Sequence, residues 1–117
     1  MIRIELPWPP ADLSPNRDRN VHWSVKASAI KGYRFGAMLR TRQVYAINDK
    51  LPDGDIPMTV TFYPPDRRRR DRTNMEGSLK SGFDGIADAL NVDDSRFAPT
   101  YRKADPVKGG LVVVEIP

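Results

Sequence analysis

Arginine and aspartate are concentrated in one short segment near the middle of the chain. Residues 66–74 read DRRRRDRTN, so Asp66 and Asp71 enclose four arginines and Arg72 follows. A charge run of this kind is often no more than a solvated surface. Guanidinium groups also bind phosphate oxygens in a bidentate manner, which suits a phosphate-bearing polymer. The run therefore predicts either a solvated surface or a contact with phosphates.

Further carboxylates follow, in a pattern that a metal ion could use. Asp93 and Asp94 form a pair, and Lys80, Asp84 and Asp88 recur at intervals of four residues. With one histidine and no cysteine in the chain, clustered carboxylates favour a hard cation, most simply Mg²⁺. Beside arginines, such a cation predicts metal-assisted attack of water on a phosphodiester. The four-residue spacing equally fits ordinary ion pairs along one side of a helix.

The composition is that of a small globular protein. The 117 residues fit a single domain, residues 1–117, and 39% hydrophobic with 29% charged residues is typical of a folded chain. The net charge of +4 permits nucleic acid as a partner. The absence of cysteine excludes a disulfide scaffold and fits a reducing cytoplasm. The start, MIRIELPWPP, lacks the apolar run of a signal peptide, and no run approaches the roughly 18 residues of a membrane helix. We therefore expect a cytoplasmic protein without a membrane contact.

Apolar periodicity predicts the first elements that must position these residues. Alternation predicts strands at residues 2–8 and 56–63, each ended by prolines. Between them a helix is predicted from Ser24 onward, with one apolar stripe. The members of that stripe are Trp23, Ala27, Ile30, Tyr33, Ala37 and Val44.

A second helix is predicted at residues 75–90, directly after the arginine run. Its apolar stripe consists of Met75, Leu79, Phe83, Ile86 and Leu90. Thr73 is predicted to cap it, with Glu76 reaching back. A straight helix of this length spans about 24 Å. Asp71 and Asp94, at its two ends, can therefore meet only if the chain folds back after the helix.

The end of the chain completes the predicted fold. Two closing strands, at residues 96–103 and 109–116, are expected to form a hairpin. The resulting order, β-α-β-α-β-β, predicts a single α+β domain with a small mixed sheet and two helices.

Several short motifs recur in one order along the chain. LPWPP is followed by Asn16, PPDRRRRD by Asn74, and Lys80 by Asp84. The triplet VDD then occupies residues 92–94, and VKGG precedes the last strand. In this order and spacing the chain resembles the RusA-type Holliday-junction resolvases, small endonucleases of bacteria and their phages.

The resemblance implies a function and a set of site residues. Family members act as homodimers that cut four-way DNA junctions by paired symmetric nicks, using Mg²⁺ or Mn²⁺. By this resemblance Asp71, Lys80 and Asp94 are the catalytic residues. Asp71 and Asp94 would hold the metal, with Asp93 and Asp84 as further candidate ligands. Lys80 would stabilise charge that develops on the phosphate or the leaving oxygen.

One position departs from the family pattern. The acidic motif Asp-x-Asp-Asn is matched at Asp71 and Asn74, but its middle aspartate is Thr73 here. Three interpretations are open. The protein is a weakened nuclease or a catalytically silent junction binder, a neighbouring carboxylate supplies the missing oxygen, or the sequence carries an inactivating change. The candidate neighbouring carboxylates are Glu76, Asp84 and Asp93.

The arginine run would hold DNA phosphates beside the acidic site. Five arginines minus two aspartates over residues 66–72 leave a local charge of +3, which attracts phosphate. The DNA-binding residues expected on this basis are Arg67, Arg68, Arg69, Arg70, Arg72, Asn74 and Lys108.

Four residues, Lys108 among them, have both a functional and a structural interpretation. Trp8 and Trp23 either stack on splayed bases or belong to the core or a dimer contact. His22 either touches DNA or a metal, or is merely solvated. Lys108 either binds phosphate or is a solvated hairpin lysine.

Overall fold

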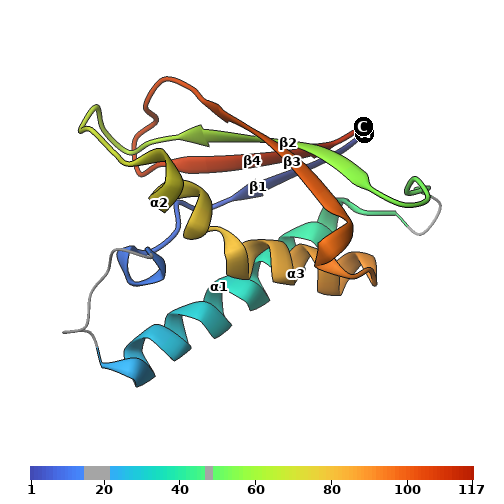
Figure 1. The fold of residues 1–117 in the computed structure, drawn as a ribbon, viewed down its shortest axis with the longest axis horizontal. Helices are drawn as coiled ribbons and strands as arrows, with labels where there is room; N and C mark the ends of the chain where they lie inside the picture. Colours follow the sequence, from blue (N-terminus) through green and yellow to red (C-terminus); the bar gives the residue numbers. More distant parts are fainter. Residues whose placement is uncertain (15–21, 47–48) are drawn as a thin grey trace.

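A mixed four-stranded sheet with helices across one of its faces forms the body of the protein (Figure 1). The computed structural model describes residues 1–14, 22–46 and 49–117. The strands are β1 (Ile2–Leu6), β2 (Ile56–Tyr63), β3 (Phe97–Lys103) and β4 (Leu111–Ile116). Their order in the sheet is β1-β4-β2-β3. The β2–β3 pair is parallel, whereas β4 is antiparallel to both of its neighbours.

Alternating apolar residues give the sheet one buried face. In β1 the side chains of Ile2, Ile4 and Leu6 are buried and the two residues between them are exposed. Val60 and Val114 lie directly opposite each other on β2 and β4, and both are fully buried. The strand periodicity read from the sequence is thus confirmed at β1 and β2, and Pro7 and Pro64 follow their last residues.

The first helix, α1 (Trp23–Val44), packs against α3 (Lys80–Leu90) and β1. A helix in this region was predicted correctly, but its buried stripe was only partly right. Tyr33 and Ala37 are buried as expected, whereas Trp23 and Val44 are exposed at 75% and 46%. The buried face of α1 continues instead to Thr41, because the helix turns only this side towards the sheet.

The close approach of α1 and α3 depends on a glycine in α3. A Cβ atom placed at Gly85 would collide with the backbone carbonyl oxygen of Arg34 in α1. Gly85 is therefore required for the distance between the two helices. Arg34 also forms a bidentate ion pair with Asp88 of α3, from Nε to Oδ2 at 2.7 Å and from the second nitrogen to Oδ1 at 2.9 Å.

The second helix was predicted as one continuous element, and this was wrong. The chain forms α2 (Arg72–Gly77) and then α3, with Ser78 and Leu79 between them. Ser78 Oγ donates to the carbonyl oxygen of Met75 at 2.8 Å, and the Leu79 amide donates to Glu76 at 3.2 Å, so the last turn of α2 closes on itself. The predicted apolar stripe is nevertheless confirmed, since all five of its residues are buried.

The predicted hairpin of the two closing strands was also wrong. β3 pairs with β2 alone, and β4 inserts between β1 and β2. The connection crosses the end of β2, where the amides of Ala104 and Val107 donate to the carbonyl oxygens of Phe62 and Pro64, each at 2.8 Å. Gly109 and Gly110, with φ of 81° and 77°, then reverse the chain into β4. These bonds hold the connection on β2, which places β4 on the far side of β2 from β3.

The remaining described segments are short. Two 3-10 turns, η1 (Ala11–Leu13) and η2 (Asp94–Arg96), lie after β1 and after α3. Asn16, one of the residues that carries the family resemblance, lies outside the described residues. Within the described ranges no helix is long and apolar enough to cross a membrane. The predicted α+β class, with a mixed sheet and helices in one small domain, is confirmed.

Candidate functional site

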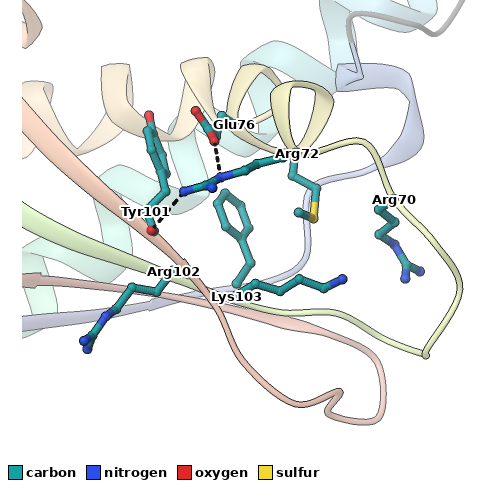
Figure 2. Close-up of a pocket in the computed structure, with 8 residues that line it drawn as sticks. Arg70, Arg72, Glu76, Tyr101, Arg102 and Lys103 are labelled. Carbon is teal, nitrogen blue, oxygen red and sulfur yellow. Dashed lines mark hydrogen bonds and ion pairs between the residues drawn. The ribbon is translucent and has the colours of Figure 1, made fainter.

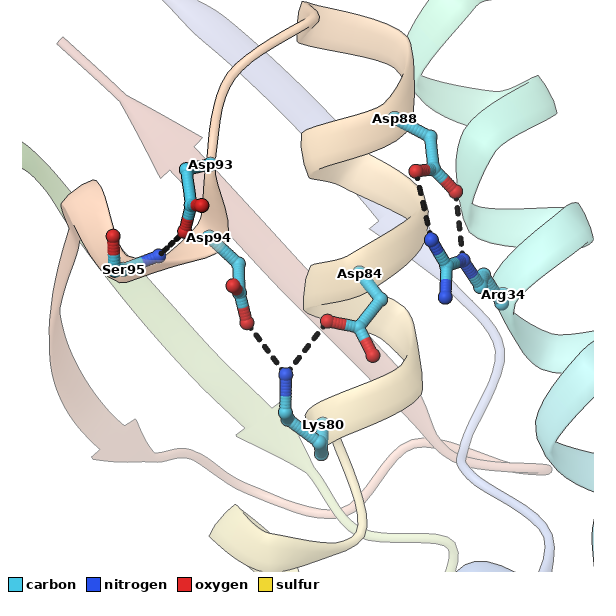
Figure 3. Close-up of polar contacts among 7 residues, drawn as sticks. All are labelled: Arg34, Lys80, Asp84, Asp88, Asp93, Asp94 and Ser95. Atoms are coloured by element: carbon cyan, nitrogen blue, oxygen red, sulfur yellow. Dashed lines mark hydrogen bonds and ion pairs between the residues drawn. The ribbon is translucent and has the colours of Figure 1, made fainter.

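Three of the predicted site residues meet at the start of α3. Lys80 is its first residue, and its ammonium donates to Asp84 Oδ1 at 2.7 Å and to Asp94 Oδ2 at 2.5 Å (Figure 3). We call Lys80, Asp84 and Asp94 the acid–lysine cluster. The pairing of Lys80 with Asp84 follows from helical spacing. The pairing with Asp94 spans 14 residues and depends on the path of the chain.

A left-handed residue makes that path possible. Asn91 ends α3 with φ 57° and ψ 47°, and the amide of Val92 donates back to the carbonyl oxygen of Ala87 at 3.1 Å. Asparagine tolerates this conformation better than most residues. The chain therefore folds back after α3, and η2 brings Asp94 to Lys80 rather than to Asp71.

Mutual hydrogen bonding shapes the electrostatics of the acid–lysine cluster. The hydrogen bonds to Asp84 and then to Asp94 raise the pKa of the Lys80 ammonium above its ordinary value. The bond from Lys80 is the main reason that the pKa of the Asp94 carboxyl is lowered. The side chains remain accessible, with Lys80 exposed at 66% and Asp94 at 35%. The acid–lysine cluster is thus a charged, solvent-facing group that a ligand can reach.

The other acidic candidates have structural partners. Asp93 caps η2, where its Oδ1 accepts from the amide of Ser95 at 2.8 Å. Asp88 pairs with Arg34 of α1, and this pair lowers the pKa of Asp88. The interpretation of Asp88 as a surface ion pair is therefore supported, although its partner lies on another helix.

Asp71 lies at the start of α2 and serves as its N-cap. Its Oδ1 accepts from the amide of Asn74 at 3.0 Å. Thr73 was predicted to be this cap and is not, because the helix begins earlier and Thr73 lies within its first turn. Glu76 pairs with Arg72 instead of reaching back to a cap.

The structure does not bring Asp71 into contact with the acid–lysine cluster. Among the described residues no hydrogen bond or ion pair joins Asp71 to Lys80, Asp84 or Asp94. In the same part of the chain, no group of three or more histidine, cysteine, aspartate or glutamate side chains is placed to hold a metal ion. The oxygens of Asp84 and Asp94 are hard donors of the kind that Mg²⁺ prefers. The point on which they converge is taken by the Lys80 ammonium.

The arginine run divides into paired and free side chains. Arg70 is only 14% exposed, and it forms an ion pair with Asp66 at 2.9 Å. It also donates to the carbonyl oxygens of Asp66 and Arg68, and its guanidinium lies 5.6 Å from the ring centroid of Trp8. Arg70 therefore organises the loop. The backbone amide of Arg68 is the main reason that the pKa of Asp66 is lowered.

The three arginines before Arg70 point into solvent. The side chains of Arg67, Arg68 and Arg69 are exposed and form no ion pair with any residue in the described ranges. An unpaired guanidinium is available to a phosphate, so these three residues form the basic surface of the loop. We call Arg67, Arg68 and Arg69 the free arginines.

The residues with two interpretations are now placed. Trp8 packs partly buried against the core, edge-on to Phe62 at 6.0 Å, whereas Trp23 is exposed at the start of α1. His22 caps α1, with Nδ1 accepting from the amide of Ser24 at 3.2 Å. Lys108 is exposed in the turn before β4.

Sequence reasoning missed two features of this region. Arg34 was not recognised as the partner of Asp88, because no local pattern links residues of different helices. A pocket between α2 and the ends of β2 and β3 was missed as well (Figure 2). Its aromatic residues, Phe62 and Tyr101, read in the sequence as ordinary strand residues.

Comparison with known proteins identifies a related bacterial protein. No protein-family model matches the sequence. An uncharacterized protein of Xylella fastidiosa (strain Temecula1) is 40% identical over 118 aligned positions, which cover 99% of this chain and 76% of the relative. Identity of this extent over almost the whole chain shows common descent, and the chain belongs to the same family as this Xylella fastidiosa protein.

Proposed function

We propose that the protein is a metal-dependent endodeoxyribonuclease that resembles the RusA-type resolvases and cuts four-way DNA junctions by paired nicks. Such an enzyme would act in DNA recombination and repair, in the cytoplasm of a bacterium or of a phage-infected cell. It would act as a homodimer, because a two-fold symmetric protein suits a substrate with two equivalent strands to cut.

One observation carries this proposal. Lys80 and Asp94 are distant in the sequence, yet the ammonium and the carboxylate meet at 2.5 Å. They are two of the three residues that the family resemblance marks as catalytic. An arrangement of lysine and carboxylates that stays open to solvent is suited to a charged, phosphate-bearing substrate.

In this proposal different residues bind the metal ion, attract the DNA and stabilise charge during cleavage. Asp84 and Asp94 would hold Mg²⁺ or Mn²⁺, with Asp71 and Asp93 as the further candidate ligands. When bound, such an ion polarises a phosphoryl oxygen and lowers the pKa of a bound water. The free arginines attract the phosphates of the DNA strand. The substrate would draw the Lys80 ammonium away from the two carboxylates. The ammonium would then stabilise charge on the phosphate or the leaving oxygen.

A second candidate function has its own support. A catalytically silent junction binder would keep the free arginines and would not need a complete metal site. Thr73 is neutral, Asp71 is engaged as a helix cap, and the described residues hold no group of three acidic or imidazole ligands. Both candidates predict junction binding, so cleavage separates them.

The test is a nicking assay on an end-labelled four-way junction, with titrations of Mg²⁺ and Mn²⁺. For the nuclease we expect paired nicks from the wild type and their loss in Asp94→Asn, while junction binding persists. Asp88→Asn is the matched control, since it makes the same change two turns further along α3 from Lys80 and should keep activity. Binding that linear duplex cannot compete away, without cleavage under either metal, would leave the silent binder. Equal competition by linear duplex would overturn both candidates.

A further inference from the structure

A pocket of about 300 Å³ lies between α2 and the ends of β2 and β3, and none of its lining residues belongs to the acid–lysine cluster (Figure 2). Its inner wall is apolar. Phe62 and Met75 are almost completely buried, and the Phe62 and Tyr101 rings stack at 6.0 Å with 20° between their planes. Burial also raises the pKa of the Tyr101 hydroxyl above its ordinary value.

The rim of the pocket is strongly basic. Arg70, Arg72, Arg102 and Lys103 line it, against Glu76 as the one acidic residue of the lining. Arg70 pairs with Asp66 and Arg72 pairs with Glu76, whereas Lys103 forms no ion pair within the described parts of the chain. The Lys103 side chain extends towards the side where Arg70 lies, and Arg102 points the opposite way (Figure 2). An anion near Lys103 would therefore be attracted by a positive charge that no acidic residue among those described compensates.

Arg72 adds a flat surface at the mouth of the pocket. Its Nε lies 3.2 Å from Glu76 Oε2, and another nitrogen lies 3.5 Å from the carbonyl oxygen of Tyr101 (Figure 2). The guanidinium is thus held from both α2 and β3 while its side chain remains 75% exposed. Unpaired bases stack on aromatic rings and on guanidinium planes of this kind.

We propose that this pocket binds one unpaired nucleotide of a DNA strand, with the base against Tyr101 and Met75 and the phosphate beside Lys103. The inference rests on the proposed function only in that DNA is taken as the partner. The volume lies at the lower end of the range for small-ligand sites, which suits one base. A base stacked within a duplex cannot enter, so the ligand is a strand with an exposed base, as occurs where branched DNA opens.

The experiment separates the base from its phosphates. Two thymidine pentanucleotides are compared, one with a central 2-aminopurine and one with a central abasic site, in EDTA so that no cleavage occurs. We expect the wild type to bind the base-bearing strand at least about fivefold more tightly, as stacking of one base provides. The 2-aminopurine fluorescence should fall on binding.

Three variants locate the effect. Tyr101→Leu should bring the affinity ratio of the two strands close to one, whereas Tyr101→Phe, which keeps the ring, should retain it. Lys103→Gln should weaken both strands and leave the ratio. Its matched control is Lys50→Gln. Lys50 precedes the start of β2, whereas the pocket lies at the end of that strand, so this identical change should weaken binding less. Thermal melts check that each variant is folded.

The outcomes are decisive for the pocket and separate from the proposed function. Equal affinity for the two strands in the wild type, or an unchanged ratio in folded Tyr101→Leu, would overturn the pocket while junction nicking could still succeed. Competition by thymidine monophosphate at the same concentration as the pentanucleotide would overturn the assignment to a strand and indicate a free nucleotide. Selective binding of the base-bearing strand without junction nicking would support the pocket and reject the nuclease.

Discussion

The acid–lysine cluster and the free arginines use charge in opposite ways. In the acid–lysine cluster, side chains from α3 and η2 converge on one point, where one positive charge meets two negative charges and offsets only one of them. The free arginines are neighbours in the sequence, yet they have no ion pair within the described ranges. Consecutive residues of an irregular loop project in different directions, so they contact an extended polymer more readily than a single atom.

This difference predicts that the acid–lysine cluster contributes to catalysis and that the free arginines contribute to affinity for DNA. Converging groups can act together on one phosphate, because a site needs several groups within a few ångströms. Diverging cations add affinity for any strand without selecting a reacting atom. Substitutions in the acid–lysine cluster should therefore alter the rate of cleavage. Substitutions of the free arginines should alter the affinity for DNA and its salt dependence.

The largest effect is expected from Lys80→Gln. If the lysine stabilises charge during cleavage, its loss should lower the nicking rate on a four-way junction by about 100-fold or more, while junction affinity changes little. Lys50→Gln is the control for the loss of one positive charge. A rate equal to that of the wild type would return Lys80 to the role of a surface ion pair with its two aspartates.

Replacement of the free arginines should act on binding instead. The triple change Arg67→Gln, Arg68→Gln and Arg69→Gln should lower the slope of log affinity against log salt by about 2.7, or roughly 0.9 for each phosphate contact. Arg70→Gln should lower the slope by less, because this guanidinium already pairs with Asp66. Fluorescence anisotropy across a salt titration measures both slopes. A larger change from Arg70→Gln would contradict the division of the run.

A smaller gain is expected from Thr73→Asp. Position 73 lies in the first turn of α2, where a carboxylate is favoured by the helix dipole, so folding should lose little. An added anionic ligand should strengthen Mg²⁺ binding, so nicking should reach its half-maximal rate at several-fold lower Mg²⁺. Thr73→Asn is the uncharged control. If neither variant changes the Mg²⁺ requirement, another carboxylate completes the site, and Glu76→Gln is the next variant to measure.

The smallest effect concerns stability against pH. The pKa of Asp94 is lowered in the folded state by Lys80, so its contribution is present above the ordinary carboxyl pKa and is lost as the pH falls through the folded value. The pKa of Lys80 is raised, so its contribution is present below the ordinary lysine pKa and is lost as the pH rises through the folded value. Between about pH 5 and 9 the pair should add a constant amount.

Urea unfolding of wild type and Asp94→Asn from pH 3 to 7 measures this contribution. The two free energies of unfolding should differ most at pH 7 and converge towards pH 3. Because both side chains are exposed, we expect the difference to be modest. A difference that stays constant over the whole range would show that the ion pair with Lys80 is not its source.

Sequence periodicity predicted the buried faces of β1 and of the segment from Met75 to Leu90, but not that of α1, where Trp23 and Val44 are exposed. The buried stripe from Met75 to Leu90 and the alternation in β1 depend on which side chains share a face, and that follows from spacing alone. The acid–lysine cluster was half predictable for the same reason. Lys80 and Asp84 are one helical turn apart, whereas the approach of Asp94 depends on the reversal at Asn91.

The sequence by itself determined where strands and helical segments lie along the chain, the apolar faces of β1 and of the segment from Met75 to Leu90, and the places where charge gathers. Only the tertiary structure decided that β4 inserts between β1 and β2 and that Asp94 meets Lys80 while Asp71 stays apart from both. The pocket of Phe62, Tyr101 and Lys103 likewise exists only because α2 packs over the ends of two strands. The physical reason is that local patterns are set by residues within one or two turns, whereas strand order and side-chain convergence depend on how separate elements pack and on the path of the chain between them.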